Sequence, residues 1–218
     1  MNKKNREIME ILELTYPDAK CALNHASPFQ LLVATVLSAQ TTDKKVNEVT
    51  EVLFVKYRNL DDFLTISQEE LEAHIRVIGL YKTKAKNLMN LFRMLQEEFG
   101  GEVPETMEEL TRLPGVGRKT ANVVLSNCFD IPAIAVDTHV FRVANRLGIV
   151  EENTPEKTEL ALMTKLDRKI WTKAHHILIF HGRQVCHARG PECGRCPVNH
   201  LCRYYKENRN KLIPKGQA

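Results

Sequence analysis

Apolar residues recur with helical spacing along almost the whole of this 218-residue chain, and this feature excludes most fold classes. An i, i+3, i+4 spacing gives a helix one apolar side that packs inward and one polar side. Only residues 131–136 resemble a strand, and Pro132 interrupts them. We therefore predict an all-α protein. The predicted helices include residues 8–16, 28–37, 43–57, 67–78, 88–99, 106–113, 121–128, 140–147 and 171–178, with one more beginning at Thr154-Pro155. Ser27, Ser67 and Thr106 are the predicted N-caps of three of these helices.

The chain has the composition of a soluble globular protein. Hydrophobic residues make up 43% and charged residues 27% of the sequence, as in ordinary domains. The longest apolar stretch, residues 31–39, is too short to cross a bilayer. The amphipathic segment near the N-terminus carries acids at Glu7, Glu10 and Glu13, which a signal peptide would lack. We expect a cytoplasmic protein with no membrane partner, in which clustered cysteines indicate a metal centre before a disulfide.

Positive charge is concentrated near the C-terminus. Residues 165–218 contain twelve Lys or Arg against three Asp or Glu, whereas the 164 residues before them contain nineteen against twenty-four. Such a basic segment favours a polyanionic partner, of which nucleic acid is the commonest. A solvated, solubilising tail explains the same charge equally well. Either role applies to the last basic residues, which are Arg203, Lys206, Arg209, Lys211 and Lys215.

Residues 113–121, with the sequence Leu-Pro-Gly-Val-Gly-Arg-Lys-Thr-Ala, are predicted to form a tight turn that leads into a helix. Gly115 and Gly117 let a ligand approach the backbone closely, and the helix presents unpaired N–H groups at the positive end of its dipole. With Arg118 beside them, these groups favour a phosphate-binding site that recognises a nucleic-acid backbone without regard to base sequence. The alternative is a plain connection between two helices.

Lys119 and Asp137 are the candidate catalytic residues. The helix dipole and Arg118 both disfavour the ammonium form of Lys119, and a neutral lysine can attack a carbonyl-like carbon to form a Schiff base. On the hairpin alone, a lysine that contacts phosphate is the simpler interpretation. Asp137 precedes the helix at 140–147 and is predicted to be its N-cap. A carboxylate held there also suits charge stabilisation or proton handling.

Four cysteines near the C-terminus predict a metal centre. Cys186, Cys193, Cys196 and Cys202 follow the spacing C-x6-C-x2-C-x5-C. Structural zinc sites usually contain two C-x2-C pairs, and only one such pair is present here. The spacing therefore favours an iron–sulfur cluster, with zinc as the alternative.

Residues near these motifs lead to further predictions. Arg189 lies in the loop between the first two cysteines and is expected to contact phosphate. His175, His176 and His181 could form a second metal site, but His175 falls on an apolar helical stripe, which favours a core histidine. Cys21 and Cys128 lie on or beside apolar stripes and are expected to be buried core thiols.

Taken together, LPGVGRKTANVVL at residues 113–125, AVDTHVFRVANR at residues 135–146 and the cysteine tail resemble the endonuclease III family, within the helix-hairpin-helix DNA glycosylase superfamily. The resemblance covers nearly the whole chain and implies a [4Fe–4S] cluster held by the four cysteines. It implies two helical lobes flanking a DNA-binding cleft. These would be a six-helix barrel over residues 22–131, with the helix-hairpin-helix at about 106–127, and an iron–sulfur lobe formed by residues 1–21 and 132–218.

The implied activity is that of a bifunctional DNA glycosylase and abasic-site lyase that removes oxidised pyrimidines from duplex DNA in base excision repair. Lys119 aligns with the family's Schiff-base lysine. Asp137 aligns with the aspartate that helps to activate this lysine and stabilises positive charge on the sugar. The damaged nucleotide would be flipped out of the duplex, and Gln40 and Leu80 align with residues that fill the hole it leaves.

The same resemblance implies a cytoplasmic, nucleoid-associated monomer whose partner is double-stranded DNA with damaged pyrimidines or abasic sites. The implied DNA contacts are Gln40, Leu80, Gly115, Gly117, Arg118, Thr120, His139 and Arg189.

Two rival functions remain open on the sequence. The first is a monofunctional adenine glycosylase of the superfamily, which carries a Glu where this chain has Thr35, lacks the equivalent of Lys119 and has an additional C-terminal domain. A thymine-mismatch glycosylase is also expected to lack the equivalent of Lys119. A non-enzymatic helix-hairpin-helix DNA-binding protein with a structural metal would need the glycines and cysteines. That protein would give no reason for Lys119 and Asp137 together.

Overall fold

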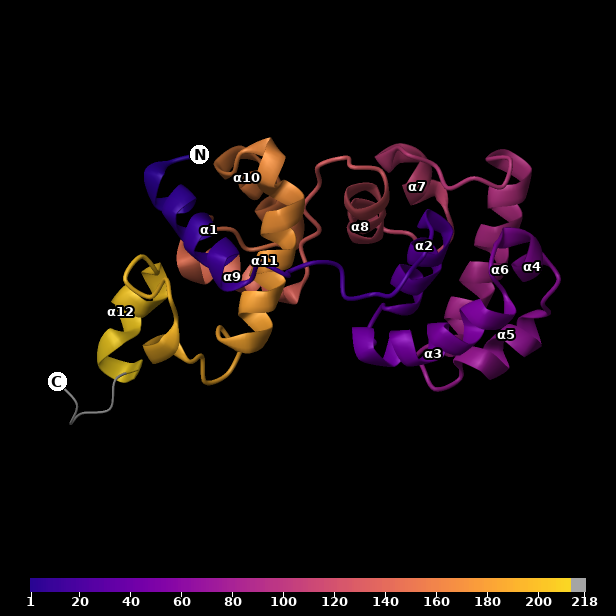
Figure 1. Cartoon of the computed structure of the whole chain (residues 1–218), viewed down its shortest axis with the longest axis horizontal. Coiled ribbons are helices and arrows are strands. Elements are labelled where there is room, and N and C mark those ends of the chain that lie inside the picture. The colour runs from indigo at the N-terminus through magenta and orange to yellow at the C-terminus, as the bar shows by residue number, and fades with distance from the viewer. Residues whose placement is uncertain (213–218) are drawn as a thin grey trace. The chain divides into compact units, whose positions relative to one another are not determined.

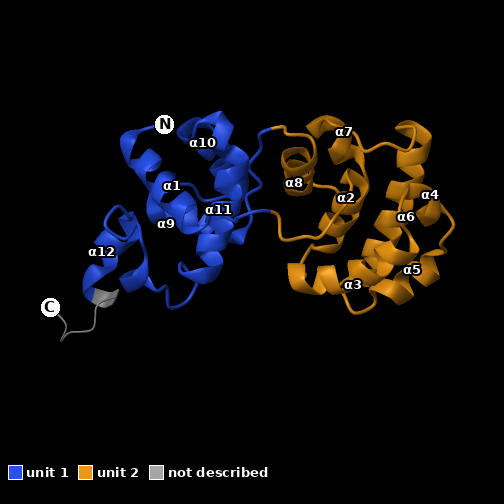
Figure 2. Ribbon diagram, in the orientation of Figure 1, with its two compact units in different colours: residues 1–20, 132–218 blue, residues 21–131 orange. Residues whose placement is uncertain are grey.

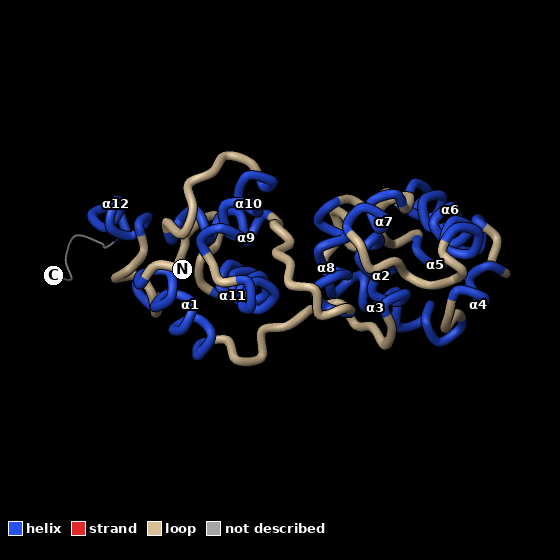
Figure 3. The backbone as a smooth tube through the Cα atoms, turned by 90° about the horizontal axis from the view of Figure 1, so that it is seen from above, coloured by secondary structure: helices blue, strands red, loops and turns tan. Residues whose placement is uncertain are grey.

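The computed structural model describes residues 1–212, and within that range it contains helices and loops but no β-strand (Figures 1 and 3). The all-α prediction is thus confirmed, and residues 131–136 form neither a helix nor a strand. In the described part of the chain, no helix combines the length and apolarity that a membrane span requires. The chain divides into two compact units, one of residues 21–131 and one of residues 1–20 with the chain from residue 132 onward (Figure 2).

The unit of residues 21–131 is described in full and contains seven helices. They are α2 (Pro28–Leu37), α3 (Asp43–Lys56), α4 (Leu60–Leu64), α5 (Gln68–Ile75), α6 (Tyr81–Glu98), α7 (Met107–Arg112) and α8 (Arg118–Cys128). Six of them coincide with helices predicted from the sequence. The exception is α4, whose five residues are too few to show a periodic pattern.

Aromatic packing explains why α4 forms. The Phe63 side chain on α4 is fully buried, and its ring centroid lies 5.5 Å from that of Phe29 on α2 and 5.0 Å from that of Phe92 on α6. Asn59 caps the helix by accepting a hydrogen bond of 3.0 Å from the Asp62 amide. Tertiary burial and one cap thus stabilise a helix that is too short to persist alone.

Predicted N-caps are confirmed at three helices of this unit. Ser27, Ser67 and Thr106 each accept a hydrogen bond from the backbone amide three residues later, at 3.2, 3.1 and 3.2 Å. The caps define where α2, α5 and α7 begin. The start of α7 matters most for function, because α7 is the first helix of the hairpin.

The second unit is built around two packed helices, α9 (Thr138–Leu147) and α11 (Trp171–Gln184). Its buried core also takes in residues of α1 (Lys3–Thr15) and α10 (Pro155–Lys165). Gly182 on α11 allows close approach to α9, because a Cβ added there would lie 3.1 Å from His139 Cβ and 3.1 Å from Val143 Cγ2. The remaining described elements are the short 3-10 helices η1 (Arg168–Ile170) and η2 (Cys193–Arg195), and α12 (Arg203–Leu212).

The basic residues at the C-terminus belong partly to a helix. Arg203, Lys206 and Arg209 lie on α12, which the sequence pattern did not predict because its apolar content is low. Arg203 forms an ion pair of 2.6 Å with Glu151, so part of the positive charge is neutralised within the unit. Lys215 lies outside the described residues.

Candidate functional site

The predicted hairpin is present between α7 and α8. The amide of Val116 donates to the Leu113 carbonyl at 3.0 Å and closes the turn, and α8 begins at Arg118 with Gly117 as its N-cap. Gly117 brings no capping side chain, and the first turn of α8 contains no acidic residue. The N-terminus of α8 therefore keeps the positive electrostatic character that suits a phosphate oxygen.

The two glycines of the hairpin serve different purposes. Gly115 has a left-handed backbone with φ of +81°, and a Cβ there would lie 3.1 Å from Asn87 Cβ and 3.3 Å from Val36 Cγ1. Gly117 has an ordinary extended conformation, and a Cβ there would meet nothing within 4 Å. Gly115 is thus required by the fold, whereas Gly117 leaves open space at the start of α8.

Lys119 lies in the first turn of α8, and its side chain is exposed. Arg118 before it is also exposed, and Thr120 after it is half-buried. The hairpin therefore presents two adjacent cationic side chains at the end of α8 where the backbone amides point outward. Lys119 belongs to the unit of residues 21–131, whereas Asp137 belongs to the other unit.

Asp137 is the N-cap of α9, as predicted. Its Oδ1 accepts hydrogen bonds from the amides of His139 and Val140, both at 2.8 Å, and its Oδ2 lies 3.2 Å from His139 Nδ1. These contacts fix the orientation of a carboxylate whose side chain is 15% exposed. His139, predicted to contact DNA, is half-buried and contacts Asp137 through both its backbone and its ring.

Gln40 and Leu80 have an unusual backbone in common. Both are exposed and both have left-handed conformations, with φ of 54° and 59°. Left-handed backbone costs a non-glycine residue about 1–2 kcal/mol and clusters at functional sites. Leu80 is also 58% exposed, although its side chain is apolar. The combination favours a functional role over a structural one for both residues.

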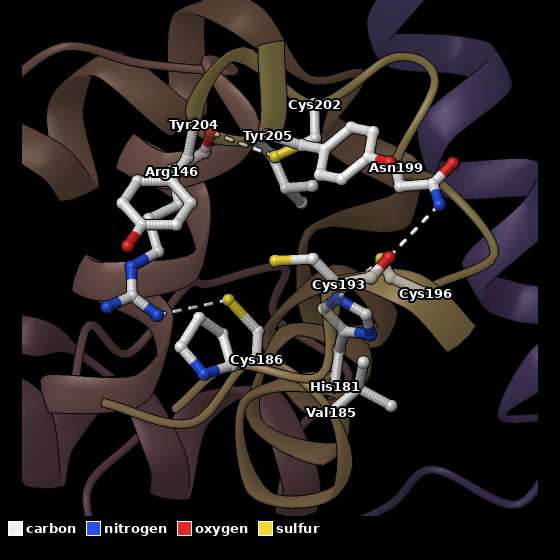
Figure 4. A pocket seen from close by; sticks show the side chains of 12 residues that line it. Arg146, His181, Val185, Cys186, Cys193, Cys196, Asn199, Cys202, Tyr204 and Tyr205 are labelled. Carbon is white, nitrogen blue, oxygen red and sulfur yellow. Dashed lines mark hydrogen bonds between the residues drawn. The ribbon is translucent and has the colours of Figure 1, made fainter. Parts of the chain in front are cut away.

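The four cysteines of the tail meet at one pocket. Cys186, Cys193, Cys196 and Cys202 all line it, and Figure 4 shows the sulfurs of Cys186, Cys193 and Cys202 around a common space. Among the described residues, no three His, Cys, Asp or Glu side chains converge closely enough to hold a single metal ion. The sulfurs therefore surround a space and do not meet at one point.

The electrostatics of this pocket fit a positively charged group. Burial, reinforced by the neighbouring cysteines, raises the pKa of Cys196 to about 11 and also raises the pKa values of Cys193 and Cys202. Four thiolates could not remain together there without compensating positive charge, which iron ions would supply. The donor set is thus suited to an iron–sulfur cluster.

Two arginines of α9 hold the cysteine loop. Arg142 donates to the Cys186 carbonyl at 3.0 Å and to the Gly182 carbonyl at 2.9 Å. Arg146 donates to the His187 carbonyl at 2.6 Å, and its Nη1 lies 3.6 Å from Cys186 Sγ. Because α9 begins at Asp137, the same helix orients the candidate catalytic carboxylate and anchors the metal-binding loop.

A buried histidine connects the pocket to α1. His181 Nδ1 lies 3.0 Å from the Tyr16 hydroxyl, and His181 Nε2 lies 3.6 Å from Cys196 Sγ. Burial raises the pKa of Tyr16 to about 12 and lowers the pKa of His181 to about 4. The phenol therefore keeps its proton beside a neutral ring, and one hydrogen-bonded chain joins Tyr16, His181 and Cys196.

Arg142 and Arg146 are not among the site residues predicted from the sequence, which also argued against His181 as a metal ligand. The two arginines stand in the motif at 135–146, but nothing local indicates that they reach carbonyls some 40 residues later. Arg189, which was predicted as a DNA contact, is exposed as expected. His175 is buried as predicted, whereas the prediction of buried thiols at Cys21 and Cys128 is wrong. Both are only half-buried, because Cys128 is the last residue of α8 and Cys21 precedes α2.

Two family models match this sequence. Residues 33–168 match the HhH-GPD superfamily of base excision DNA repair proteins, and residues 186–202 match the iron-sulfur binding domain of endonuclease III. The second match begins and ends on the first and last cysteines of the pocket.

Curated relatives are similar over nearly the full chain. Endonuclease III of Bacillus subtilis is 50% identical over 201 residues, which are 92% of this chain and 92% of the relative. Endonuclease III of Escherichia coli strain K12 is 44% identical over 205 residues, which are 94% of this chain and 97% of the relative.

Solved structures show the same similarity. A trapped endonuclease III–DNA covalent intermediate matches with a TM-score of 0.89 at 48% identity, covering 96% of this chain and 100% of that one. A thermostable thymine-DNA glycosylase matches with a TM-score of 0.84 at 27% identity, covering 94% of this chain and 98% of that one.

Proposed function

The chain belongs to the endonuclease III family of base excision DNA repair proteins, and from that premise we propose that Lys119 is its nucleophile and Asp137 its catalytic carboxylate. The protein is a bifunctional DNA glycosylase and lyase that binds DNA and carries a [4Fe–4S] cluster. The observation that carries the proposal is the position of Lys119, an exposed lysine in the first turn of α8, directly behind the glycine hairpin.

Lys119 Nζ, in its neutral form, would attack C1′ of the damaged nucleotide. The new N–C1′ bond forms as the glycosidic C1′–N bond breaks, and the base departs with the bonding electron pair and takes up a proton. Opening of the sugar ring then turns the adduct into a protonated Schiff base, with O4′ leaving as a hydroxyl. Loss of a C2′ proton and cleavage of the C3′–O bond cut the strand 3′ to the lesion, and water releases Lys119 from the product.

Asp137 would act on the charge that develops in these steps. Its Oδ1 is occupied by two helix amides, so the carboxylate is held in a fixed direction and needs no reorganisation during the reaction. A fixed negative charge stabilises the cationic sugar as the base leaves. As the family resemblance implies, this carboxylate would also help to activate Lys119, whose ammonium group must lose a proton before attack.

The DNA contacts follow from the geometry of the hairpin unit. The N-terminus of α8 and the open space at Gly117 would bind a backbone phosphate, together with Arg118 and Thr120. Gln40 and Leu80 would fill the hole left by the flipped nucleotide, which their exposure and left-handed backbones support. His139 and Arg189 of the other unit are the remaining proposed contacts.

We extend the proposal to the substrate and the cluster ligands. Cys186, Cys193, Cys196 and Cys202 would ligate the cluster, which when bound cross-links residues 186–202 into a rigid loop carrying Arg189. The substrates would be oxidised pyrimidines and abasic sites in duplex DNA. The protein would act as a cytoplasmic, nucleoid-associated monomer, since a single chain contains both candidate catalytic residues.

Borohydride trapping tests this proposal directly. Wild type, Lys119→Gln and the surface control Lys86→Gln would be incubated with a duplex that contains one thymine glycol. Borohydride reduces an imine to a stable amine, so a covalent protein–DNA band reports the Schiff base. We expect the band with wild type and with Lys86→Gln, and none with Lys119→Gln.

The other outcomes are equally informative. Base release without a band in wild type would mean that water is the nucleophile and that Lys119 only contacts phosphate. A band that survives in Lys119→Gln would place the nucleophile at another amine. No band and no release on any oxidised pyrimidine would contradict the proposed substrate class.

A further inference from the structure

Lys84, one turn into α6, is a buried cation without a carboxylate partner among the ion pairs of the described residues. Its side chain is 4% exposed, and burial lowers its pKa. The Nζ donates to the Leu37 carbonyl at 2.9 Å and to Thr41 Oγ1 at 3.0 Å. A buried ammonium group is costly for a fold, so its position calls for an explanation that the catalytic steps do not supply.

The partners of Lys84 lie on both sides of Gln40. Leu37 is the last residue of α2, and its carbonyl is at the negative end of the α2 dipole, where a cation is favoured. Thr41 is the residue directly after Gln40. The ammonium group therefore spans the loop of residues 38–42 that connects α2 to α3.

The backbone of Lys84 is bonded to that of Leu80. The Lys84 amide donates to the Leu80 carbonyl at 3.0 Å, which is the first hydrogen bond of α6. The turn before Leu80 also lies against the first loop, because a Cβ added to Gly79 would be 4.0 Å from the Gln40 carbonyl oxygen. One residue thus bonds to the loops of both Gln40 and Leu80.

We propose that Lys84 is a positioning residue that holds the loops of Gln40 and Leu80 together as one rigid element for insertion into duplex DNA. The inference rests on the proposed roles of Gln40 and Leu80. Two strained, exposed residues need rigid support, because a left-handed backbone relaxes when its surroundings do not fix it. Lys84 supplies that support with three hydrogen bonds, two from its side chain and one from its amide.

The test uses the fact that insertion matters only where a base pair must be opened. Single-turnover base release would be measured on two duplexes, one with thymine glycol paired with adenine and one with thymine glycol opposite a one-nucleotide gap. Lys84→Met should slow base release on the paired duplex by about tenfold, because part of the free energy needed to unstack the base is no longer recovered by insertion. On the gapped duplex its rate of base release should stay within about twofold of the wild-type rate. Lys86→Met, an exposed neighbour on α6, is the matched control and should behave as wild type.

A milder variant guards against loss of folding. Thr41→Val removes one of the two hydrogen-bond acceptors of the Lys84 ammonium group. It should slow base release on the paired duplex alone, and by less than Lys84→Met does. Equal slowing of Lys84→Met on both duplexes, or no slowing on either, would overturn the inference.

Leu80→Ala separates this failure from failure of the proposed function. If Leu80→Ala is slowed on the paired duplex while Lys84→Met is not, only the role of Lys84 is wrong, and if neither is slowed, the insertion role of Leu80 fails too.

Discussion

Replacing each hairpin glycine by alanine should separate the stability of the hairpin from its ability to bind DNA. At Gly115, with φ of +81°, a Cβ costs about 1–2 kcal/mol in backbone strain. The same Cβ would lie 3.1–3.3 Å from Asn87 and Val36, which adds about 1–3 kcal/mol of overpacking. We expect Gly115→Ala to lower the free energy of unfolding by about 2–5 kcal/mol, a large part of the 5–15 kcal/mol typical of a domain.

At Gly117 the expectation is reversed. The backbone is in an allowed extended conformation and a Cβ meets nothing within 4 Å. Alanine is a poorer N-cap than glycine, so Gly117→Ala should cost no more than about 1 kcal/mol of stability. The added methyl group stands where a phosphate would approach α8. DNA affinity should therefore fall about tenfold, and the slope of log affinity against log salt should become shallower by about one.

Urea unfolding and fluorescence anisotropy with duplex DNA over a series of salt concentrations measure the two effects. The reasoning would be refuted if Gly117→Ala destabilised the protein as much as Gly115→Ala, since the steric difference between the positions would then have no effect. Unchanged DNA affinity of Gly117→Ala at every salt concentration would contradict phosphate binding at the start of α8.

Three further predictions concern the other unit. Asp137→Asn should keep the free energy of unfolding within about 0.5 kcal/mol of wild type, because asparagine is an equally good N-cap. Its rate of single-turnover base release should nevertheless fall by at least about a hundredfold. Asp137→Ala should in addition lose about 1 kcal/mol of stability. Cys202→Ser should lose most of the bound iron in elemental analysis, whereas Cys128→Ser should keep it, because Cys202 lines the cluster pocket and Cys128 does not. Burial lowers the pKa of His176 from 6.5 to about 3. Between these pH values the histidine is protonated in the unfolded chain but neutral in the folded chain, so the free energy of unfolding should fall as the pH drops from about 6.5 toward 3. Denaturation at several pH values should show a flatter dependence for His176→Phe, and an unchanged slope would argue against this assignment.

Local patterns in the sequence determined the helical class and most of the helix starts. Ser27, Ser67 and Thr106 cap their helices as predicted, because a cap acts over only three residues and needs no distant partner. The cysteine spacing and the hairpin motif are local in the same sense, so the amino-acid order alone indicates an iron–sulfur site and a phosphate site. The roles of Lys119 and Asp137 came from resemblance to a family. Taken alone, a lysine behind the hairpin is explained by phosphate contact, and an aspartate before a helix is explained by N-capping.

Tertiary structure decided what depends on contacts between distant residues. The helix α4 forms because Phe63 is buried between Phe29 and Phe92, although its five residues carry no pattern. Gly115 and Gly117 look alike in the sequence, and only their neighbours show that one is required for packing and the other leaves open space. Lys84 resembles any helical lysine until its ammonium group is seen at a carbonyl 47 residues earlier in the chain. Hydrogen bonds and packing act through space over a few ångströms, so a sequence that separates partners by dozens of residues carries no local signal of them.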